Sequence, residues 1–381
     1  MKTLTSAVLA AGLALGAAAP LAAQDLTITN AHIVVGNGQV IERGSIVVRG
    51  GRIESVASGA PARTVGQVID AHRHINTGPE EKAQMQRQLE AGYTTILSGG
   101  GPGDGNLTLR EHIESGQING PRIIPSERIR LAQHTPESAR AAVREMKANG
   151  IDYTGEISLT PVPGPTPQEL EVLRAVLDEG KKVGVNVQVH AVSSPAMNAA
   201  VEMGIPLLVH LPNKDWVSKA DAEKLAAAGT KILMTIGFGA PVFGVFADDN
   251  EPRFRDGKPW PESIVDGVGG GVEAGYAMVN ARTIFDAGGI IGYCTDTTYD
   301  ALAGLEHELK SMNVVFSMQD MVKIMGPNTA AYLGMEDQLG TLEPGKLADI
   351  LLLDGDPLEG YWNWLKTKVT IKEGEIVVDK R

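Results

Sequence analysis

The sequence has 381 residues, of which 43% are apolar and 21% charged, so it can bury a large core and lacks the composition of a disordered chain. A net charge of -12 excludes the broad basic surface that a nucleic-acid partner requires. The single cysteine, Cys294, excludes an internal disulfide.

The first 24 residues have the features of an export signal. Lys2 gives a positive start, residues 4–19 are apolar and small, and Ala22 and Ala23 precede a cleavage point near residue 23 or 24. This apolar run is short for a membrane anchor, and no later stretch is long enough to span a bilayer. We expect a periplasmic or secreted protein with no membrane contact once residues 1–24 are removed.

Both ends of the remaining chain are rich in predicted strands. Around Gly50 and Gly51 the pattern is that of a β-hairpin. The predicted strands at the two ends are 25–30, 45–49, 52–54, 346–354, 367–371 and 374–378. We expect residues 25–66 and 339–381 to form the two parts of one small β-sandwich domain.

Residues 67–338 alternate apolar strands with amphipathic helices, the pattern of βα units. The predicted strands are 67–72, 93–98, 122–127, 151–157, 185–190, 206–210, 231–236 and 289–295. Eight is the number that closes a (β/α)8 barrel, so we predict an α/β fold with a TIM-type barrel.

Helix starts and one long insertion complete this pattern. Thr135-Pro136 and Thr166-Pro167 each combine a capping threonine with a proline in the first turn. Residues 239–270 follow the seventh strand and contain Pro, Gly and clustered charges. We interpret this insertion as an active-site loop.

Histidines and carboxylates fall where the predicted strands end. His72 and His74 end the first strand, and residues two apart in a strand point to the same side. Because barrel strands direct their C-terminal ends to one mouth, these side chains are expected to meet there. The corresponding residues on the fourth, fifth, sixth and eighth strands are Glu156, His190, His210 and Asp296.

Imidazole nitrogens and carboxylate oxygens are suited to zinc and similar divalent ions. A metal with an open position makes water reactive near neutral pH, and Asp296 is placed to accept the proton of that water. Any one strand-end histidine is also compatible with a structural role. The remaining histidines, His32, His112, His134 and His307, have no such position, and we interpret them as structural or surface residues.

At these residues the chain resembles the amidohydrolase superfamily, and most closely its imidazolonepropionase- and prolidase-like branch. The matching segments run from about residue 25 to 378. They are Val68–His74, Leu109–Gly116, Gly120–Arg122, Thr295–Asp296, Leu305–Leu309 and Leu339–Ile350.

The resemblance implies one or two divalent metals, usually zinc, and hydrolysis of amide, peptide, lactone or related bonds. It assigns His72, His74, His190 and His210 as metal ligands, and Asp296 as a ligand and as the catalytic base. Relatives often have a carboxylated lysine after the fourth strand, which this sequence lacks. Other members use a glutamate there, so Glu156 is a candidate bridge between two ions.

Three further residues are candidates for contact with the substrate. Arg128 and Arg130 follow the third strand and have the geometry to hold a carboxylate, although structural or surface roles are equally compatible. Tyr153 lies beside the fourth strand end, where it would either donate to an oxyanion or pack in the core.

We therefore predict an exported hydrolase that cleaves a C–N bond in a small molecule, such as an N-acyl amino acid or a dipeptide. One alternative is a mononuclear enzyme that deaminates its substrate or opens a cyclic amidine or lactone. The other is an exported barrel that binds a ligand without turnover. The sequence leaves the substrate, the number of metals and a homo-oligomeric state open.

Overall fold

The computed structural model describes residues 25–58, 63–237, 271–297 and 300–381. The expected export signal and the expected insertion at 239–270 lie outside these ranges. Among the helices described, none combines the length and apolar character needed to cross a membrane.

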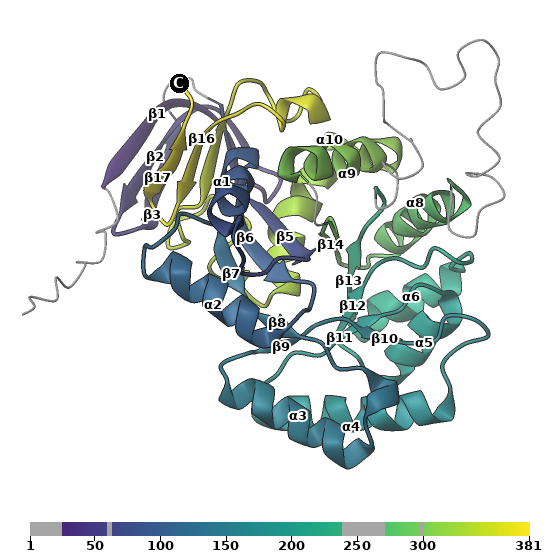
Figure 1. Ribbon diagram of the computed structural model, residues 1–381. Helices are drawn as coiled ribbons and strands as arrows, with labels where there is room; N and C mark the ends of the chain where they lie inside the picture. The colour runs from purple at the N-terminus through teal and green to yellow at the C-terminus, as the bar shows by residue number, and fades with distance from the viewer. Residues whose placement is uncertain (1–24, 59–62, 238–270, 298–299) are drawn as a thin grey trace, which may run out of the picture.

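Strands from the two ends of the chain pair in one sheet of seven strands (Figure 1). The strands are β1 (Leu26–Val34), β2 (Val40–Arg49), β3 (Arg52–Ser58), β4 (Arg63–Gly66), β15 (Ile350–Leu353), β16 (Thr367–Lys372) and β17 (Glu375–Asp379). Their order is β17-β16-β15-β4-β1-β2-β3. The hairpin expected at Gly50-Gly51 is confirmed, since Arg49 of β2 pairs with Arg52 of β3.

This sheet differs from the expected sandwich because its strands are hydrogen-bonded as one unit. Irregular register in several strand pairs allows the sheet to bend, as β-bulges do. The free edge of β3 then meets the segment before β15, where Ile53 N–H donates to Lys346 O at 3.0 Å and Gly345 N–H donates to Ile53 O at 2.8 Å. The bent sheet encloses its own apolar core, which includes Ile33, Ile46 and Ile371.

All eight strand segments expected in the body of the chain are present as parallel strands in the middle of the molecule. They are β5 (Val68–Arg73), β6 (Tyr93–Ser98), β7 (Arg122–Ile124), β8 (Ser126–Glu127), β9 (Tyr153–Thr154), β10 (Ile157–Ser158), β11 (Gln188–His190), β12 (Leu207–Val209), β13 (Lys231–Met234) and β14 (Ile291–Tyr293). Two of the expected strands are each split in two. The third is divided into β7 and β8 at Pro125, which has no N–H to donate to a ladder, and the fourth is divided into β9 and β10.

Hydrogen bonds join these strands as β5-β6-β7, β8-β9 and β10-β11-β12-β13-β14. The last strand lies beside the first, because Asp296 N–H, just after β14, donates to His72 O of β5 at 2.9 Å. The arrangement is consistent with a (β/α)8 barrel joined to a sheet domain.

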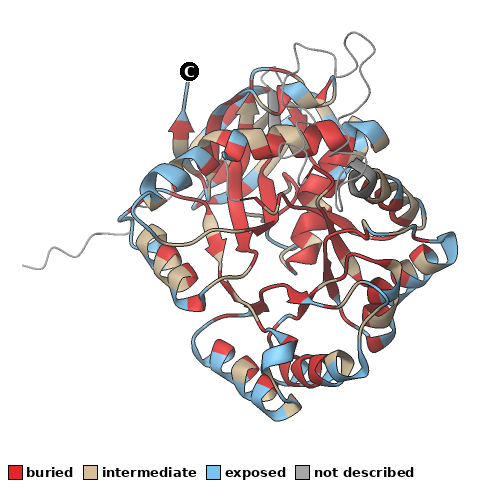
Figure 2. Cartoon of the chain, turned by 45° about the vertical axis from the view of Figure 1, so that its right-hand side comes forward, coloured by how far each residue is buried: buried red, intermediate tan, exposed pale blue. Residues whose placement is uncertain are grey.

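Most of the helices lie around the outside of the strands, and buried residues are concentrated toward the middle of the molecule (Figures 1 and 2). They are α1 (Glu81–Ala91), α2 (Gly103–Glu114), α3 (Pro136–Ala148), α4 (Pro167–Val183), α5 (Ser194–Met203), α6 (Lys219–Ala228), α8 (Gly271–Asp286), α9 (Ala301–Val315), α10 (Met318–Lys323) and α11 (Thr329–Tyr332). Both predicted helix starts are confirmed, since Thr135 and Thr166 cap α3 and α4 in capping boxes.

A separate apolar cluster fills the space between the strands. It contains Ile69 of β5, Leu97 of β6, Leu207 of β12 and Leu233 of β13. Residues 330–339, in and after α11, add further side chains to the cluster. The interior is therefore packed on the side from which the strands start, and polar side chains gather where they end.

A buried ionic network fastens the sheet domain to the parallel strands. Arg122 of β7 donates to Asp349 Oδ2 at 3.1 Å and to Thr95 Oγ1 at 2.6 Å, and it also pairs with Glu373. Asp349 is fully buried and also accepts the backbone N–H of Glu373 at 2.8 Å. A buried charge without its partner is costly, so this network couples the two parts energetically.

We predict that Asp349→Asn lowers the free energy of unfolding by about 3 kcal/mol, because it leaves the Arg122 guanidinium short of a buried counter-charge. The matched control is Asp354→Asn, which removes an exposed ion pair with Lys368 and is expected to cost less than about 0.5 kcal/mol. Urea denaturation followed by circular dichroism measures both. Equal effects of the two substitutions would contradict the role given to Asp349.

Candidate metal centre

The structure brings the six predicted ligands together at the C-terminal ends of the parallel strands. His72 lies in β5 and His74 just beyond it, His190 ends β11 and His210 follows β12. Glu156 lies between β9 and β10, and Asp296 follows β14. Three overlapping sets drawn from these six have their ligand atoms within 4.8 Å of one another.

Asp296 forms one focus of the cluster. Its Oδ1 lies 3.2 Å from His72 Nε2 and 3.0 Å from His74 Nε2. Its Oδ2 lies 3.6 Å from His210 Nε2. One carboxylate therefore faces imidazoles from both the first strand and the sixth.

Glu156 forms the second focus. Its Oε2 lies 2.8 Å from His190 Nδ1, 3.2 Å from His210 Nε2 and 3.8 Å from His72 Nε2. Its other oxygen, Oε1, accepts a hydrogen bond from Arg128. This guanidinium leaves Oε2 as the oxygen that is directed into the cluster.

His72 supplies an independent indication that a cation belongs here. Its side chain is completely buried, yet neither ring nitrogen makes a hydrogen bond within the described residues. Buried polar atoms normally have a partner, and Nε2 is directed between the two carboxylates. Zinc bonds of about 2.1 Å in a tetrahedron separate neighbouring ligand atoms by about 3.4 Å. The separations of 2.8–3.8 Å across this cluster fit such an ion.

A β-bulge and two strained residues aim the ligands. Ala71 belongs to the interior cluster, and an irregularity in the pairing of β5 with β6 allows the next residue, His72, to face inward as well. His210 and Asp296 have φ angles of 65° and 52°, which non-glycine residues rarely adopt. Such strain persists only where the surrounding structure holds it, and it concentrates at functional sites.

Buried polar contacts hold the ligands from behind. Asp70 is buried, and its Oδ1 accepts the backbone N–H groups of His72 at 3.2 Å and Thr295 at 3.1 Å, which ties β5 to β14. Thr235 Oγ1 lies 2.5 Å from His210 Nδ1. Gly100 O lies 3.2 Å from His74 Nδ1. Contacts of this kind fix the ring orientation of metal-binding histidines.

The charges of the cluster keep both carboxylates ionised. Burial alone would raise the pKa of Asp296, but its electrostatic interactions with His210 and with the neighbouring His72 and His74 rings bring it below its ordinary value. Burial likewise opposes ionisation of Glu156, and hydrogen bonds with His190 and His210 lower its pKa. The adjacent Asp296 raises the pKa of His74. Ionised carboxylates are the form in which these groups bind metals.

The structure does not bring Tyr153 to the cluster. Its hydroxyl donates to Leu333 O at 2.6 Å, and its ring packs in the interior cluster with Ile69 and Leu97. The expected role as an oxyanion donor is therefore replaced by the packing role. Tyr153 precedes Glu156 by three residues, which is about 10 Å along an extended strand, so its side chain lies below the mouth.

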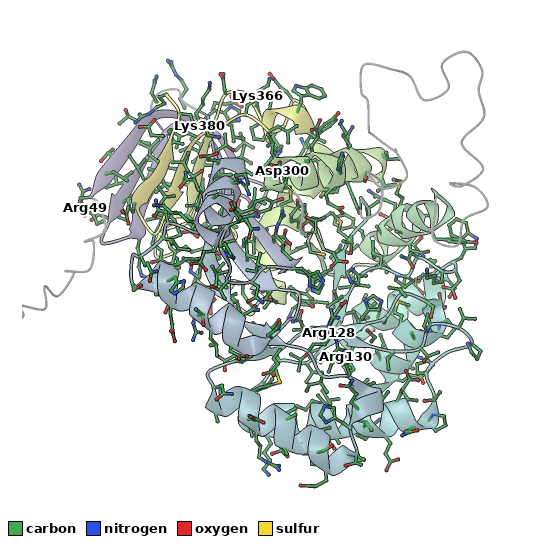
Figure 3. All side chains as sticks on the ribbon, viewed as in Figure 1. Arg49, Arg128, Arg130, Asp300, Lys366 and Lys380 are labelled. Atoms are coloured by element: carbon green, nitrogen blue, oxygen red, sulfur yellow. The ribbon has the colours of Figure 1, made fainter. Side chains whose placement is uncertain are left out.

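Arg128 and Arg130 both line a cleft of about 530 Å³ that includes Glu156 and Ser158. Figure 3 labels the two arginines close together, beside the parallel strands. Arg128 is committed to Glu156, whereas Arg130 is exposed. Of the two, Arg130 is the one available to a ligand in the cleft.

Two polar residues of this site were not singled out from the sequence. Thr235 directly follows β13 and lies within the seventh expected strand, 231–236, next to its last residue, so its position near a strand end was a signal that could have identified it. Asp70 precedes the two first-strand histidines, but its backbone partners at Thr295 come from the far end of the chain. The four histidines interpreted as structural are outside all three ligand sets.

Comparison with known proteins gives a family and a fold. A sequence profile of the Amidohydrolase family matches residues 49–378. No curated protein sequence matches the chain. Solved structures that resemble it include an amidohydrolase (TM-score 0.75, 21% identity, covering 93% of this chain and 98% of that one).

Two further structures show the same architecture. A Xaa-Pro dipeptidase with bound methionine has a TM-score of 0.75 at 21% identity, with 92% of this chain and 98% of that one covered. Phenylurea hydrolase B has a TM-score of 0.73 at 20% identity, with 93% and 96% covered. At these identities the structural likeness establishes the fold alone.

The space beside His72 allows a direct test of the cluster. A Cβ atom at Gly99 would lie 2.8 Å from His72 Nε2, so Gly99→Ala is expected to displace that ring. We predict that zinc affinity falls by about 10–100-fold, the scale for disturbing a ligand's support. Gly101→Ala is the control, since a Cβ there would meet only Asn106 Nδ2 at 3.7 Å. Competition with a chromophoric chelator gives both Kd values, and unchanged affinity in Gly99→Ala would contradict ligation by His72.

Proposed function

The chain belongs to the amidohydrolase family, and we propose that it is an exported, metal-dependent enzyme that hydrolyses the amide bond of a small molecule such as an N-acyl amino acid or a dipeptide. Enzymes of this family act on carbon–nitrogen bonds. The observation that carries the proposal is the convergence of two ionised carboxylates and four imidazoles from separate strand ends. Export rests on the sequence of residues 1–24.

The grouping of the ligands favours two ions with Glu156 between them. Glu156 belongs to two of the three ligand sets. In one it joins His72 and His74, and in the other it joins His190 and His210. Zinc is the ion that this mixture of imidazole and carboxylate suits best.

When bound, divalent ions in such a site polarise a carbonyl group and lower the pKa of water from about 15.7 to about 7. The residues of the chain then supply the proton transfers. Asp296 lies 3.0–3.2 Å from the first-strand histidines and is ionised at neutral pH, so it accepts a proton from the attacking water. As the C–N bond breaks, Asp296 returns this proton to the leaving nitrogen, and the products are a carboxylate and an amine.

The Arg128 guanidinium positions Glu156 in this scheme. By holding Oε1, it directs Oε2 toward the histidines of both ligand sets. Arg130 has no such task, and it lines the same cleft with its guanidinium exposed. We assign it to the carboxylate of the substrate, which a planar guanidinium recognises with two parallel hydrogen bonds.

A second function is supported by the set formed by His72, His210 and Asp296, which is complete without Glu156. A single ion there corresponds to the mononuclear alternative, a deaminase or a hydrolase of cyclic amidines or lactones. Metal content separates the two, since about two ions per chain supports the amide hydrolase and about one supports the alternative. Ligand binding without turnover is not proposed, because family membership makes the chain an enzyme.

We predict that Asp296→Asn retains metal and lowers kcat by at least ~100-fold, because the amide cannot accept the proton of water. His72→Ala is the comparison variant and is expected to lose metal and activity together. The assay is turnover of acyl-amino acids, dipeptides, aryl amides and lactones, with metal content measured on the same samples. Turnover of Asp296→Asn at the wild-type rate would remove Asp296 from the mechanism.

We also predict that Arg130→Gln raises KM by about 10-fold or more for substrates with a free carboxylate, the scale for losing hydrogen bonds to a charged group. The same substrates with the carboxylate amidated are expected to be unaffected. Arg43→Gln, an exposed arginine of the sheet domain, serves as the control. An equal change for charged and amidated substrates would exclude Arg130 from carboxylate recognition.

A further inference from the structure

The buried carboxyl group of Glu308, on α9, accepts hydrogen bonds from the backbone just after the end of β13. Glu308 is 2% exposed, and its Oε1 accepts the N–H of Ile236 at 2.8 Å while its Oε2 accepts the N–H of Gly237 at 2.6 Å. Two consecutive backbone donors thus point at the two oxygens of one side chain. Such a pair of N–H groups forms a concave site suited to an anion.

The residue just before this pair touches the metal centre. Thr235 Oγ1 lies 2.5 Å from His210 Nδ1, on the opposite side of the ring from Nε2. His210 Nε2 is the atom directed at Glu156 and Asp296. A neutral imidazole has one N–H, and in the tautomer that carries it on Nδ1, Thr235 Oγ1 accepts it and the lone pair of Nε2 is left for a metal.

The backbone around both residues is tightly constrained. His210 has a φ of 65°, which requires support from its surroundings. A Cβ atom on Gly237 would lie 2.8 Å from Glu308 Oε2 and 2.9 Å from the carbonyl group of His307, so Glu308 and the backbone of α9 together occupy the space that a side chain would need. Glu308 is also expensive to bury, since burial raises its pKa to about 8.

We propose that Glu308 is a positioning residue of the metal centre, which fixes residues 235–237 so that the Thr235 hydroxyl holds His210 in its ligating orientation. The inference rests on the proposed function, because it assigns His210 as a ligand. Glu308 does not touch the ligand cluster, and its effect passes through the backbone and Thr235.

The test compares zinc affinity with folding stability in full-length protein. Glu308→Gln is expected to weaken zinc binding by about 10–100-fold, the scale for losing support of a ligand. The apo-protein is expected to keep its Tm within a few degrees of wild type, because the amide keeps the size of the side chain and one of its two acceptor oxygens. Glu306→Gln, two residues before Glu308 in α9 and paired with Lys310, is the matched control with no expected effect on zinc.

A double-mutant cycle tests the route through Thr235. Thr235→Val is expected to weaken zinc binding to a similar degree, whereas Thr235→Ser, which keeps the hydroxyl, is expected to bind zinc as the wild type does. Glu308→Gln combined with Thr235→Val is expected to bind zinc no more weakly than the poorer single variant, because both interrupt one connection. Additive losses would overturn the proposed route.

Gly237→Ala provides a second variant if Glu308→Gln fails to fold, since it keeps Glu308 but its Cβ forces the carboxylate and the adjacent His307 backbone away from residues 235–237. It is expected to lower zinc affinity in the same range. Wild-type affinity in a folded Glu308→Gln or Gly237→Ala protein would overturn the inference alone. Absence of zinc binding by the wild-type protein would instead overturn the proposed function.

Discussion

Two carboxylates and four imidazoles share a small, mostly buried space, and the rest of the structure depends on the balance of charge within it. Burial opposes ionisation of Asp296 and Glu156, yet the surrounding rings keep both ionised. His72 is fully buried, and neither of its ring nitrogens makes a hydrogen bond in the part of the chain that the structure describes. A divalent cation at this place would interact favourably with the carboxylates and the imidazoles at once.

The fold provides this convergence by placing one or two ligands at the end of each contributing strand. Parallel strands deliver their C-terminal ends to one face, while the packed interior around Leu97 and Leu233 fills the other end. Individual hydrogen bonds then orient the ligands. Asp70 joins the first and last strands by accepting the N–H groups of His72 and Thr295, and Arg128 donates to Glu156. The sheet domain stays attached through the buried Arg122–Asp349 pair, at a distance from the chemistry.

Some features of this arrangement follow from local sequence patterns and were predicted, whereas others depend on contacts between distant parts of the chain. Strand-end position and alternation led to His72, His74, His190, His210 and Asp296, because a parallel strand determines both where its last residue lies and which way it points. For Tyr153 the sequence left an oxyanion contact and core packing equally open, because nearness in sequence to Glu156 does not give the depth of a side chain along its strand. The split at Pro125 and the bend of the terminal sheet both result from local interruptions in strand pairing. The alternation of apolar and polar residues does not predict where such interruptions occur. Glu308 could not be predicted, since its partners are backbone N–H groups of a distant strand end.

The most direct test of the account is to locate the metal itself. Crystals of the protein grown with zinc and measured at the zinc absorption edge would show anomalous scattering only where the ion binds. We expect two peaks, one beside His72, His74 and Asp296 and the other beside His190 and His210, with Glu156 between them. Fully loaded crystals with no peak among these residues would contradict the central claim.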